Sequence, residues 1–231
     1  MTEVVDRVLV VAAHPDDEIL GLGGTLARHV DEGATVDVLI MAEGATSRDV
    51  MRDTSGRAGE MTALRVAAQR AAEIIGTRAP RFGGFPDNRM DGLDRLDVIK
   101  LVEAAVKEVR PDVVYTHHPH DLNIDHRITH EAVLTACRPL PGVPISAIYA
   151  YETVSSTEWA VEGTAFKPAH FVEITAQLAR KIAALEVYAL EMRPIPHARS
   201  IEAVRALASV RGASVGVPVA EAFTVVRQVR R

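Results

Sequence analysis

Three residues with side chains that can bind metals or transfer protons, His14, Asp16 and Asp17, directly follow an apolar run. The run, Val8–Ala13, has the length and the β-branched content of a strand that is buried on both faces. In open α/β sheets the ligand site lies at the carboxyl ends of the strands. Imidazole nitrogen and carboxylate oxygen are both ligands of divalent metals. This segment therefore predicts metal-assisted chemistry.

A second polar run, Thr116–His126, is expected to offer the remaining ligand. It holds four of the nine histidines of the chain within ten residues. It comes directly after Asp112–Thr116, which is typical of a short strand, so we expect it at the same edge of the sheet as His14. A catalytic zinc site has three protein ligands and one open position. The histidine count alone does not decide which side chain is the third ligand.

Apolar residues at helical spacing alternate with short apolar runs along the chain. Strands that alternate with helices favour parallel βαβ units with right-handed crossovers. We therefore predict a Rossmann-like layered α/β fold, with a mostly parallel sheet and helices on both faces, in a single domain over residues 1–231. The expected strands are Val8–Ala13, Val36–Met41, Asp112–Thr116, Ile145–Tyr151 and Phe171–Ile174. The expected helices are Ile19–Val30, Met61–Ile75, Leu96–Val109, Ile128–Cys137, Leu178–Ala189 and Ile201–Val210.

The composition narrows the class of protein. A formal charge of −5 and a pI of about 6.0 give no basic surface, so nucleic acid is not an expected partner. The one cysteine, Cys137, cannot form a disulfide within the chain, which favours a reducing compartment. No apolar run has the length of a signal peptide core or of a membrane span. The expectation is a cytoplasmic protein.

Two motifs, Ala13–Glu18 (Ala-His-Pro-Asp-Asp-Glu) and Asp121–His126 (Asp-x-Asn-x-Asp-His), resemble those of the zinc-dependent PIG-L/LmbE-like de-N-acetylases. The resemblance also includes Phe85–Arg89 and three C-terminal segments that are weaker individually, Lys181–Tyr188, Pro196–Ser200 and Ala220–Phe223. The resemblance implies that His14, Asp17 and His126 bind the metal. It also implies that Asp16 is the general base. The cofactor implied is Zn²⁺, and Fe²⁺ or another divalent cation also suits a nitrogen and oxygen ligand set.

The chain departs from the family pattern at one position. Many family members have a histidine three residues before the last ligand, where it stabilises the tetrahedral intermediate, and here that position is Asn123. An asparagine amide can donate a hydrogen bond but carries no charge and cannot act as an acid. Losing one oxyanion donor costs on the order of 3–4 kcal/mol. Either Asn123 fills the role as a neutral donor, or His118 or His120 replaces it.

The resemblance also implies a substrate-binding arginine near the start of the helix expected over Met61–Ile75. Arg57 and Arg65 are two candidates, and either could equally be a solvated charge on the helix. The other candidates for substrate contact are Asp87, His118, Asp121 and His197. The segment Glu43–Gly59 has a mixed composition and is expected to be a mobile loop beside the site.

These observations favour a metal-dependent hydrolase that removes an acetyl group from an N-acetylated amino sugar or its conjugate, with Asp16 as general base. The expected partner is a small molecule, and a homo-oligomer is compatible with the sequence. Two alternatives remain open: a hydrolase of another small amide, such as an N-formyl or N-acyl antibiotic group, and a non-catalytic metal- or nucleotide-binding module. Asp16 favours an enzyme, because a purely structural zinc site is closed by four protein ligands.

Overall fold

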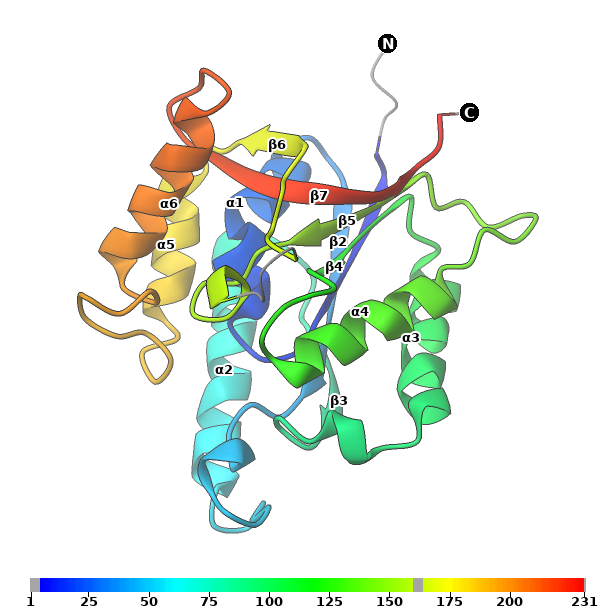
Figure 1. Ribbon diagram of the computed structural model, residues 1–231, viewed down its shortest axis with the longest axis vertical. Coiled ribbons are helices and arrows are strands. Elements are labelled where there is room, and N and C mark those ends of the chain that lie inside the picture. The colour runs from blue at the N-terminus through cyan, green and yellow to red at the C-terminus, as the bar shows by residue number, and fades with distance from the viewer. Residues whose placement is uncertain (1–4, 160–163, 231) are drawn as a thin grey trace.

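The computed structural model describes residues 5–159 and 164–230. In these residues seven strands form one sheet in the order β3-β2-β1-β4-β5-β7-β6 (Figure 1). The strands are β1 (Arg7–Ala12), β2 (Thr35–Ala42), β3 (Arg81–Phe85), β4 (Val113–His117), β5 (Ala147–Tyr151), β6 (His170–Glu173) and β7 (Ala220–Gln228). Strands β1 to β5 pair in parallel, whereas β7 is antiparallel to both β5 and β6. The predicted α/β fold with a mostly parallel sheet is confirmed.

The strand order reverses between β1 and β4. The chain passes from β1 outward to β2 and β3, then returns to place β4 on the other side of β1. Val8 accordingly pairs with Val36 of β2 and with Val113 of β4. Ligands of open α/β sheets bind outside the carboxyl ends of the strands at such a switch point. The turn after β1 and the polar run after β4 meet there.

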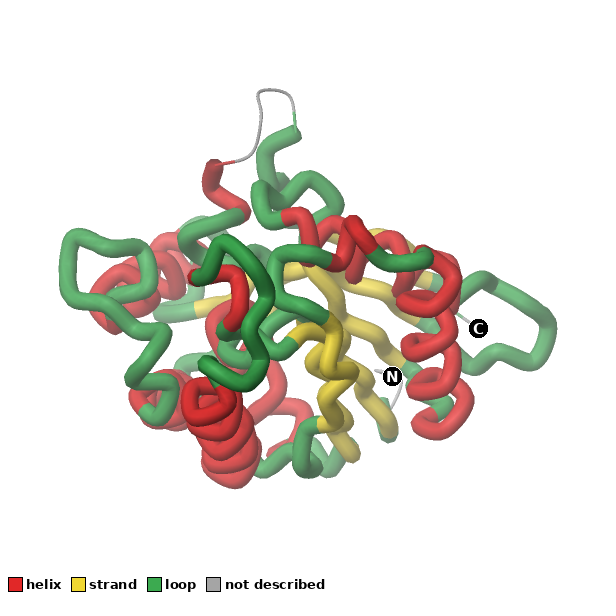
Figure 2. Tube along the Cα trace, turned by 90° about the horizontal axis from the view of Figure 1, so that it is seen from below, coloured by secondary structure: helices red, strands yellow, loops and turns green. Residues whose placement is uncertain are grey.

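Helices cover both faces of the sheet, as the flanking helices in Figure 2 show. The helices are α1 (Asp17–Asp31), α2 (Ala58–Ile75), α3 (Arg95–Val109), α4 (Ile124–Ala136), α5 (Leu178–Glu186) and α6 (Ile201–Ala213). Helices α1, α2 and α5 pack together on one face, and α3 packs with α4 on the other. Val8 and Val10 of β1 join the first core, whereas Leu9 and Val11 join the second, so β1 is buried on both faces as predicted. In the described part of the chain, no helix combines the length and the apolar character needed to cross a membrane.

One predicted helix begins four residues earlier than expected. Helix α4 starts at Ile124 rather than Ile128, because the side-chain oxygen of Asn123 accepts a hydrogen bond from the backbone N–H of Asp125 at 2.9 Å. This contact satisfies one of the backbone donors that a helix leaves free at its first turn. His126 therefore lies in the first turn of α4, where the helix fixes its direction, and not in a loop.

Strand β7 was not predicted from the sequence. Its first residues, Ala220–Phe223, include two alanines and a glutamate, which are depleted in strands. Glu221 is nevertheless only 4% exposed. Packing between β5 and β6 outweighs the weak intrinsic preference of this segment, and the burial of Glu221 has a separate cause in helix α1.

Helix α1 is interrupted at Leu22, whose φ of −149° is not helical. Glu221 accepts a hydrogen bond from the backbone N–H of Gly24 at 3.0 Å, just past the interruption. Lys181 of α5 donates to the backbone carbonyl of Leu20 at 2.9 Å and to Glu221 at 2.5 Å. A buried ion pair therefore satisfies the backbone groups that the interruption frees, and it attaches α5 and β7 to α1.

Candidate metal centre

The turn between β1 and α1 gives two neighbouring aspartates different surroundings. The backbone N–H of His14 donates to Asp17 Oδ2 at 2.8 Å, and Asp17 is the first residue of α1. Asp16 has a φ of 115°, in the region that residues other than glycine rarely adopt. Such backbone strain clusters at functional sites. As a result Asp17 faces histidines, whereas Asp16 faces Arg199.

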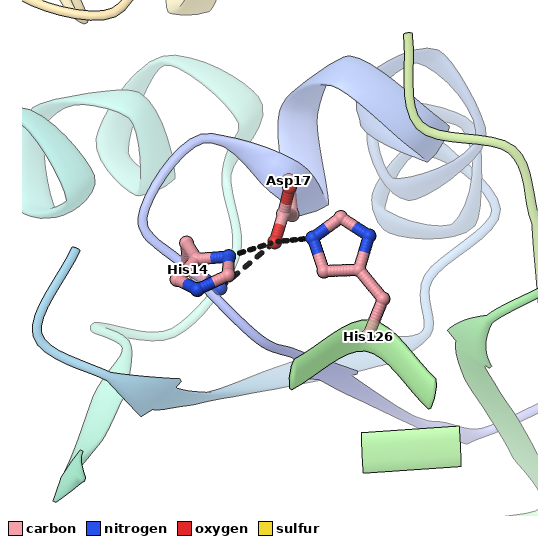
Figure 3. A group of neighbouring side chains, drawn as sticks. All are labelled: His14, Asp17 and His126. Carbon is pink, nitrogen blue, oxygen red and sulfur yellow. Dashed lines mark hydrogen bonds and ion pairs between the residues drawn. The ribbon is translucent and has the colours of Figure 1, made fainter. Parts of the chain in front are cut away.

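His14, Asp17 and His126, called the metal group below, lie together at the switch point. Figure 3 shows the Asp17 carboxylate between the two imidazole rings. Asp17 Oδ2 is 3.3 Å from His14 Nδ1 and 3.3 Å from His126 Nε2. One potential ligand atom from each residue lies within 4.8 Å of the others. The structure thus brings together the three residues that were predicted as ligands, from the turn after β1, from α1 and from α4.

Two features of the metal group suit a divalent cation: the types of its donor atoms, and a carboxylate oxygen that has no hydrogen-bond partner. Asp17 Oδ1 is buried and accepts no hydrogen bond from the described residues. A buried polar atom without a partner is costly, and a cation would offset the charge of this carboxylate. Two imidazole nitrogens and one carboxylate oxygen are ligands that catalytic zinc sites use. The same set accepts other divalent ions, including Fe²⁺.

Two further carboxylates, those of Asp87 and Asp125, support His14 from the other side of its ring. His14 Nε2 lies 3.2 Å from Asp87 Oδ1 and 3.2 Å from Asp125 Oδ2. Asp125 in turn accepts the backbone N–H of Asn88 at 2.7 Å. Histidines that bind metals usually donate their second ring N–H to such a group, which fixes the tautomer and the ring orientation. Nδ1 of His14 is thereby left to face Asp17.

Asp87 was predicted to contact substrate, and the structure places it against His14. It is 2% exposed, and its second oxygen accepts the backbone N–H of Ser47 at 3.1 Å. Ser47 belongs to the short 3-10 helix Thr46–Arg48, within the segment Glu43–Gly59. That segment therefore lies beside the site, as expected from the sequence.

Asp121 and His117 hold His126. His126 Nδ1 lies 3.1 Å from Asp121 Oδ1, and the ring of His117 stacks on that of His126 with centroids 3.9 Å apart. Asp121 is buried and accepts hydrogen bonds from the hydroxyls of Ser156 and Thr157. Asp121 was also predicted to contact substrate, and the structure places it behind a member of the metal group.

The neighbouring charges set the protonation of the metal group. Burial lowers the pKa of His126, but the carboxylates of Asp17 and Asp121 outweigh it and raise this pKa to about 9. Burial also lowers the pKa of His14, but three neighbouring carboxylates outweigh it and raise this pKa well above 6.5. Burial, followed by the charge of His126, lowers the pKa of His117 well below 6.5. Protons and a cation therefore compete for the nitrogens of the metal group.

Asp16 lies next to the metal group in sequence and is paired separately. Its side chain is 2% exposed, and Oδ2 accepts a hydrogen bond from Arg199 Nη1 at 3.0 Å. Burial raises the pKa of Asp16 well above 3.8, and the charge of Arg199 opposes this change. Glu18, two residues after Asp16, also has its pKa raised by burial, to about 7. A carboxyl group with a raised pKa is suited to take up and release a proton near neutral pH.

The three candidates for an oxyanion donor, Asn123, His118 and His120, have different surroundings. The side-chain oxygen of Asn123 caps α4 through Asp125, which leaves its amide N–H groups as donors. His118 Nε2 lies 3.2 Å from the backbone carbonyl of Thr164, and its ring lies 5.7 Å from that of His120. Among the described residues, His118 makes no hydrogen bond, ion pair or ring contact with the metal group. Asn123 lies at the N-cap of α4, three residues before His126.

The two arginines predicted to bind substrate make their contacts elsewhere. Arg57 forms ion pairs with Asp49 at 2.7 Å and with Glu60 at 2.5 Å. Arg65 is exposed on α2, with its guanidinium 5.3 Å from the centroid of the Phe82 ring. Neither forms an ion pair with the metal group or with Asp16 among the described residues.

The segment that follows α5 supplies a different arginine. His197, a predicted substrate contact, is exposed, and its Nδ1 accepts the backbone N–H of Arg199 at 3.0 Å. Arg199 itself reaches Asp16. Among ion pairs of the described residues, Arg199 is the one arginine or lysine that contacts any of Asp16, Asp17 and Glu18.

Comparison with known proteins identifies the family. The family model described as PIG-L: GlcNAc-PI de-N-acetylase matches residues 9–137. This range is more than half of the chain and includes every member of the metal group. The chain belongs to the PIG-L family. The resemblance seen in the motifs Ala13–Glu18 and Asp121–His126 is thereby confirmed.

Named relatives of this PIG-L chain include deacetylases. A 1D-myo-inositol 2-acetamido-2-deoxy-α-D-glucopyranoside deacetylase of Rhodococcus erythropolis (strain PR4 / NBRC 100887) is 35% identical over 196 residues, which are 71% of this chain and 66% of that protein. A protein of the same name from Rhodococcus opacus (strain B4) is 34% identical over 64% of this chain and 61% of its own length. The chain thus spans just under two thirds of the length of these relatives.

Solved structures confirm the PIG-L fold. The N,N'-diacetylchitobiose deacetylase from Pyrococcus horikoshii matches with a TM-score of 0.76 and 23% identity, over 96% of this chain and 84% of that one. The 4-carboxy-2-hydroxymuconate hydratase from Pseudomonas putida KT2440 matches with a TM-score of 0.79 and 22% identity, over 98% of both chains. The same fold is thus found in a deacetylase and in a hydratase. The function of this PIG-L chain must therefore be argued from its site.

Two residues at this PIG-L site were not assigned a role from the sequence: Asp125 and Glu191. Asp125 had a usable signal, because it directly precedes a predicted ligand in the motif Asp121–His126. Glu191 lies beyond the end of α5 and belongs to no periodic pattern, so its contact with Arg199 depends on the fold alone.

Proposed function

We propose that this PIG-L protein is a zinc-dependent hydrolase that removes the acetyl group from a small N-acetylated amino sugar or its conjugate, with residues 1–231 forming one domain. The observation that carries the proposal is the buried metal group beside a separately paired carboxyl group, that of Asp16. Membership of the family supports a hydrolytic deacetylation. The names of the relatives support an amino sugar as the acetylated group.

The residues of the site divide the work of amide hydrolysis. His14, Asp17 and His126 would hold the cation, which when bound would activate a water molecule and polarise the amide carbonyl. Asp16 takes a proton from the attacking water and passes it to the departing amine. Asn123 donates an amide N–H to the oxyanion. The products are acetate and the free amine of the sugar.

The substrate that we propose is an N-acetylglucosaminyl conjugate of a small polar alcohol. Relatives are named as deacetylases of such conjugates with inositol and, in Bacillus cereus (strain ATCC 14579), with L-malate. Of the positions predicted to contact substrate, we propose that Asp87 and Asp121 act instead on the histidines that they touch. This assignment explains why both carboxylates are buried.

The test is a comparison of acetylated substrates on protein of known metal content. The chelated protein is reloaded with Zn²⁺ or Fe²⁺ and incubated with N-acetylglucosamine, N,N'-diacetylchitobiose and the N-acetylglucosaminyl conjugates of inositol and L-malate. Acetate and primary amine are both quantified. The expected result is release of the two products in equal amounts, with zinc and with at least one conjugate.

The Asp16→Asn variant provides the matched control, because it preserves the shape of the residue. It is expected to bind zinc and to release acetate about 10²–10⁴-fold more slowly than the wild type. If zinc-loaded wild-type protein releases no acetate from any of these compounds, the proposal is wrong. Release of formate from an N-formyl analogue, without release of acetate, would point to the hydrolysis of another small amide.

A further inference from the structure

Arg199 lies between the acidic side chain of Asp16 and a second carboxylate, that of Glu191. Its Nη1 is 3.0 Å from Asp16 Oδ2 and 3.2 Å from Glu191 Oε2. Its Nε donates to the hydroxyl of Ser155 at 2.8 Å. The side chains are 24% exposed for Arg199, 2% for Asp16 and 11% for Glu191. The guanidinium is thus fixed by three partners, and one of them is the proposed general base.

The pair of Arg199 and Glu191 is the inner part of a longer chain of alternating charges. Glu191 Oε1 accepts a hydrogen bond from Arg48 Nη2 at 2.5 Å, and Arg48 Nη1 donates to Glu60 Oε2 at 2.7 Å. Glu60 then pairs with Arg57 at 2.5 Å. This chain connects the segment after α5 with the segment Glu43–Gly59 and the start of α2. Arg199 is therefore held from outside the site.

Asp16 depends on an external partner for its orientation. It is followed by Asp17 and Glu18, so three consecutive residues have buried carboxyl groups. Asp16 is the N-cap residue of α1, but its side chain makes no capping hydrogen bond. A planar guanidinium can fix the direction of a carboxylate more closely than a flexible ammonium can. Of the described lysines and arginines, Arg199 is the one in position to do so.

We propose that Arg199 is a positioning residue for the reaction: its contact with Oδ2 fixes the direction of the Asp16 carboxylate, and Glu191 and Ser155 fix Arg199. This inference rests on the proposed function, in which Asp16 moves protons. A merely structural ion pair would contribute to stability and leave the catalytic rate unchanged. A positioning role predicts instead a large loss of catalytic rate, because a displacement of about 1 Å at a reacting group can cost about 10²-fold in rate.

The experiment compares Arg199→Met, Arg199→Lys and Glu191→Gln with the control Arg81→Met. Arg81 also lies between two carboxylates, Asp37 at 3.2 Å and Glu108 at 2.6 Å, but at the start of β3. The probe is the N-acetylglucosaminyl conjugate of inositol. We expect Arg199→Met to lower kcat about 10²-fold with little change in KM or zinc content. Arg199→Lys should recover part of kcat, Glu191→Gln should show a smaller loss, and Arg81→Met should keep the wild-type kcat.

A crystal structure of Arg199→Met supplies a readout that does not depend on turnover. The expected structure has an intact metal group and a rotated Asp16 side chain. An unmoved Asp16 carboxylate overturns the inference, even if the protein proves inactive on every acetylated sugar and the proposed function fails. An increase in KM at unchanged kcat also overturns it, because Arg199 would then bind substrate. If Arg199→Met does not fold, the same two measurements on Glu191→Gln and Arg199→Lys decide the question.

Discussion

Histidines lie at both ends of the parallel strands, the carboxyl ends (called the carboxyl edge below) and the amino ends (called the amino edge). Their neighbours give these histidines pKa values shifted in opposite directions. Burial lowers the pKa of each. At the carboxyl edge, the carboxylates of Asp17 and Asp121 outweigh the burial of His126 and raise its pKa to about 9. At the amino edge, His29 near the end of α1 has a tyrosine partner, Tyr115, with His29 Nε2 3.0 Å from the hydroxyl, and its pKa falls to about 4. The neighbouring charge, and not the residue type, distinguishes a metal site from an aromatic core.

The amino edge also shows that open volume does not mark the chemistry. A cavity of about 520 Å³ lies there, lined in part by Tyr115, Tyr149 and His170. The rings of Tyr149 and His170 stack with centroids 4.3 Å apart. The metal group does not line this cavity. Converging carboxylates with perturbed protonation are the better guide to the site.

The largest expected effect tests the carboxyl edge. Asp16→Asn should lower kcat by about 10²–10⁴-fold, because the amide cannot take up a proton. Zinc content should remain that of the wild type, since Asp16 is outside the metal group. The matched change at the other edge, His29→Gln, should leave kcat unaltered. Steady-state kinetics with metal analysis checks both, and equal losses in the two variants would remove the distinction between the edges.

The next effect concerns α1, which runs from one edge to the other. Lys181→Met should lower the free energy of unfolding by about 3–5 kcal/mol, because it leaves the carboxylate of Glu221 buried without its partner. Lys181 and Glu221 are 3% and 4% exposed. The double variant Lys181→Met/Glu221→Gln should recover part of the loss, since no charge is then stranded. Urea unfolding measures both, and a loss below about 1 kcal/mol in the single variant would contradict this account.

The sequence predicts the strand and the motif that begin the site better than it predicts the groups that support them. Val8–Ala13 is apolar at every position, so strand β1 and the residues at its end were found from composition and motif. The sequence did not predict that Asp87 and Asp121 are buried behind histidines. Which group contacts a metal-binding histidine depends on how distant elements pack. Asp16 and Arg199 are 183 residues apart in the chain, beyond any local pattern. Strand β7 was missed because tertiary packing overrides the low strand preference of its first residues.

A smaller effect separates ligands from the groups that support them. Asp125→Asn should weaken zinc binding about 10–100-fold, because His14 loses one of its two carboxylate partners. Asp37→Asn is the control, since Asp37 is a buried acid paired with arginines away from the metal group. Competition with a chelator of known affinity measures the zinc Kd of each. A change of equal size in the control would show that the effect is one of general stability.

The smallest effect is the dependence of stability on pH that His29 causes at the amino edge. Its sign follows from the two pKa values of this residue. His29 titrates near 6.5 in the unfolded chain and near 4 in the folded protein. Between these values the unfolded state binds a proton that the folded state does not, so stability must fall as the pH falls from 6.5 towards 4. For this one group the loss between pH 6.5 and pH 5 is about 1.5 kcal/mol.

His29→Gln isolates that contribution, because glutamine can keep a hydrogen bond to Tyr115 but does not titrate. The free energy of unfolding of the variant should fall less steeply with acid than that of the wild type, by about 1.5 kcal/mol over the same interval. Urea unfolding at pH 7, 6.5 and 5 provides the two curves. Parallel curves would mean that His29 is protonated as readily in the folded protein as in the unfolded chain. The contrast with His126, whose carboxylate neighbours favour the proton, would then be lost.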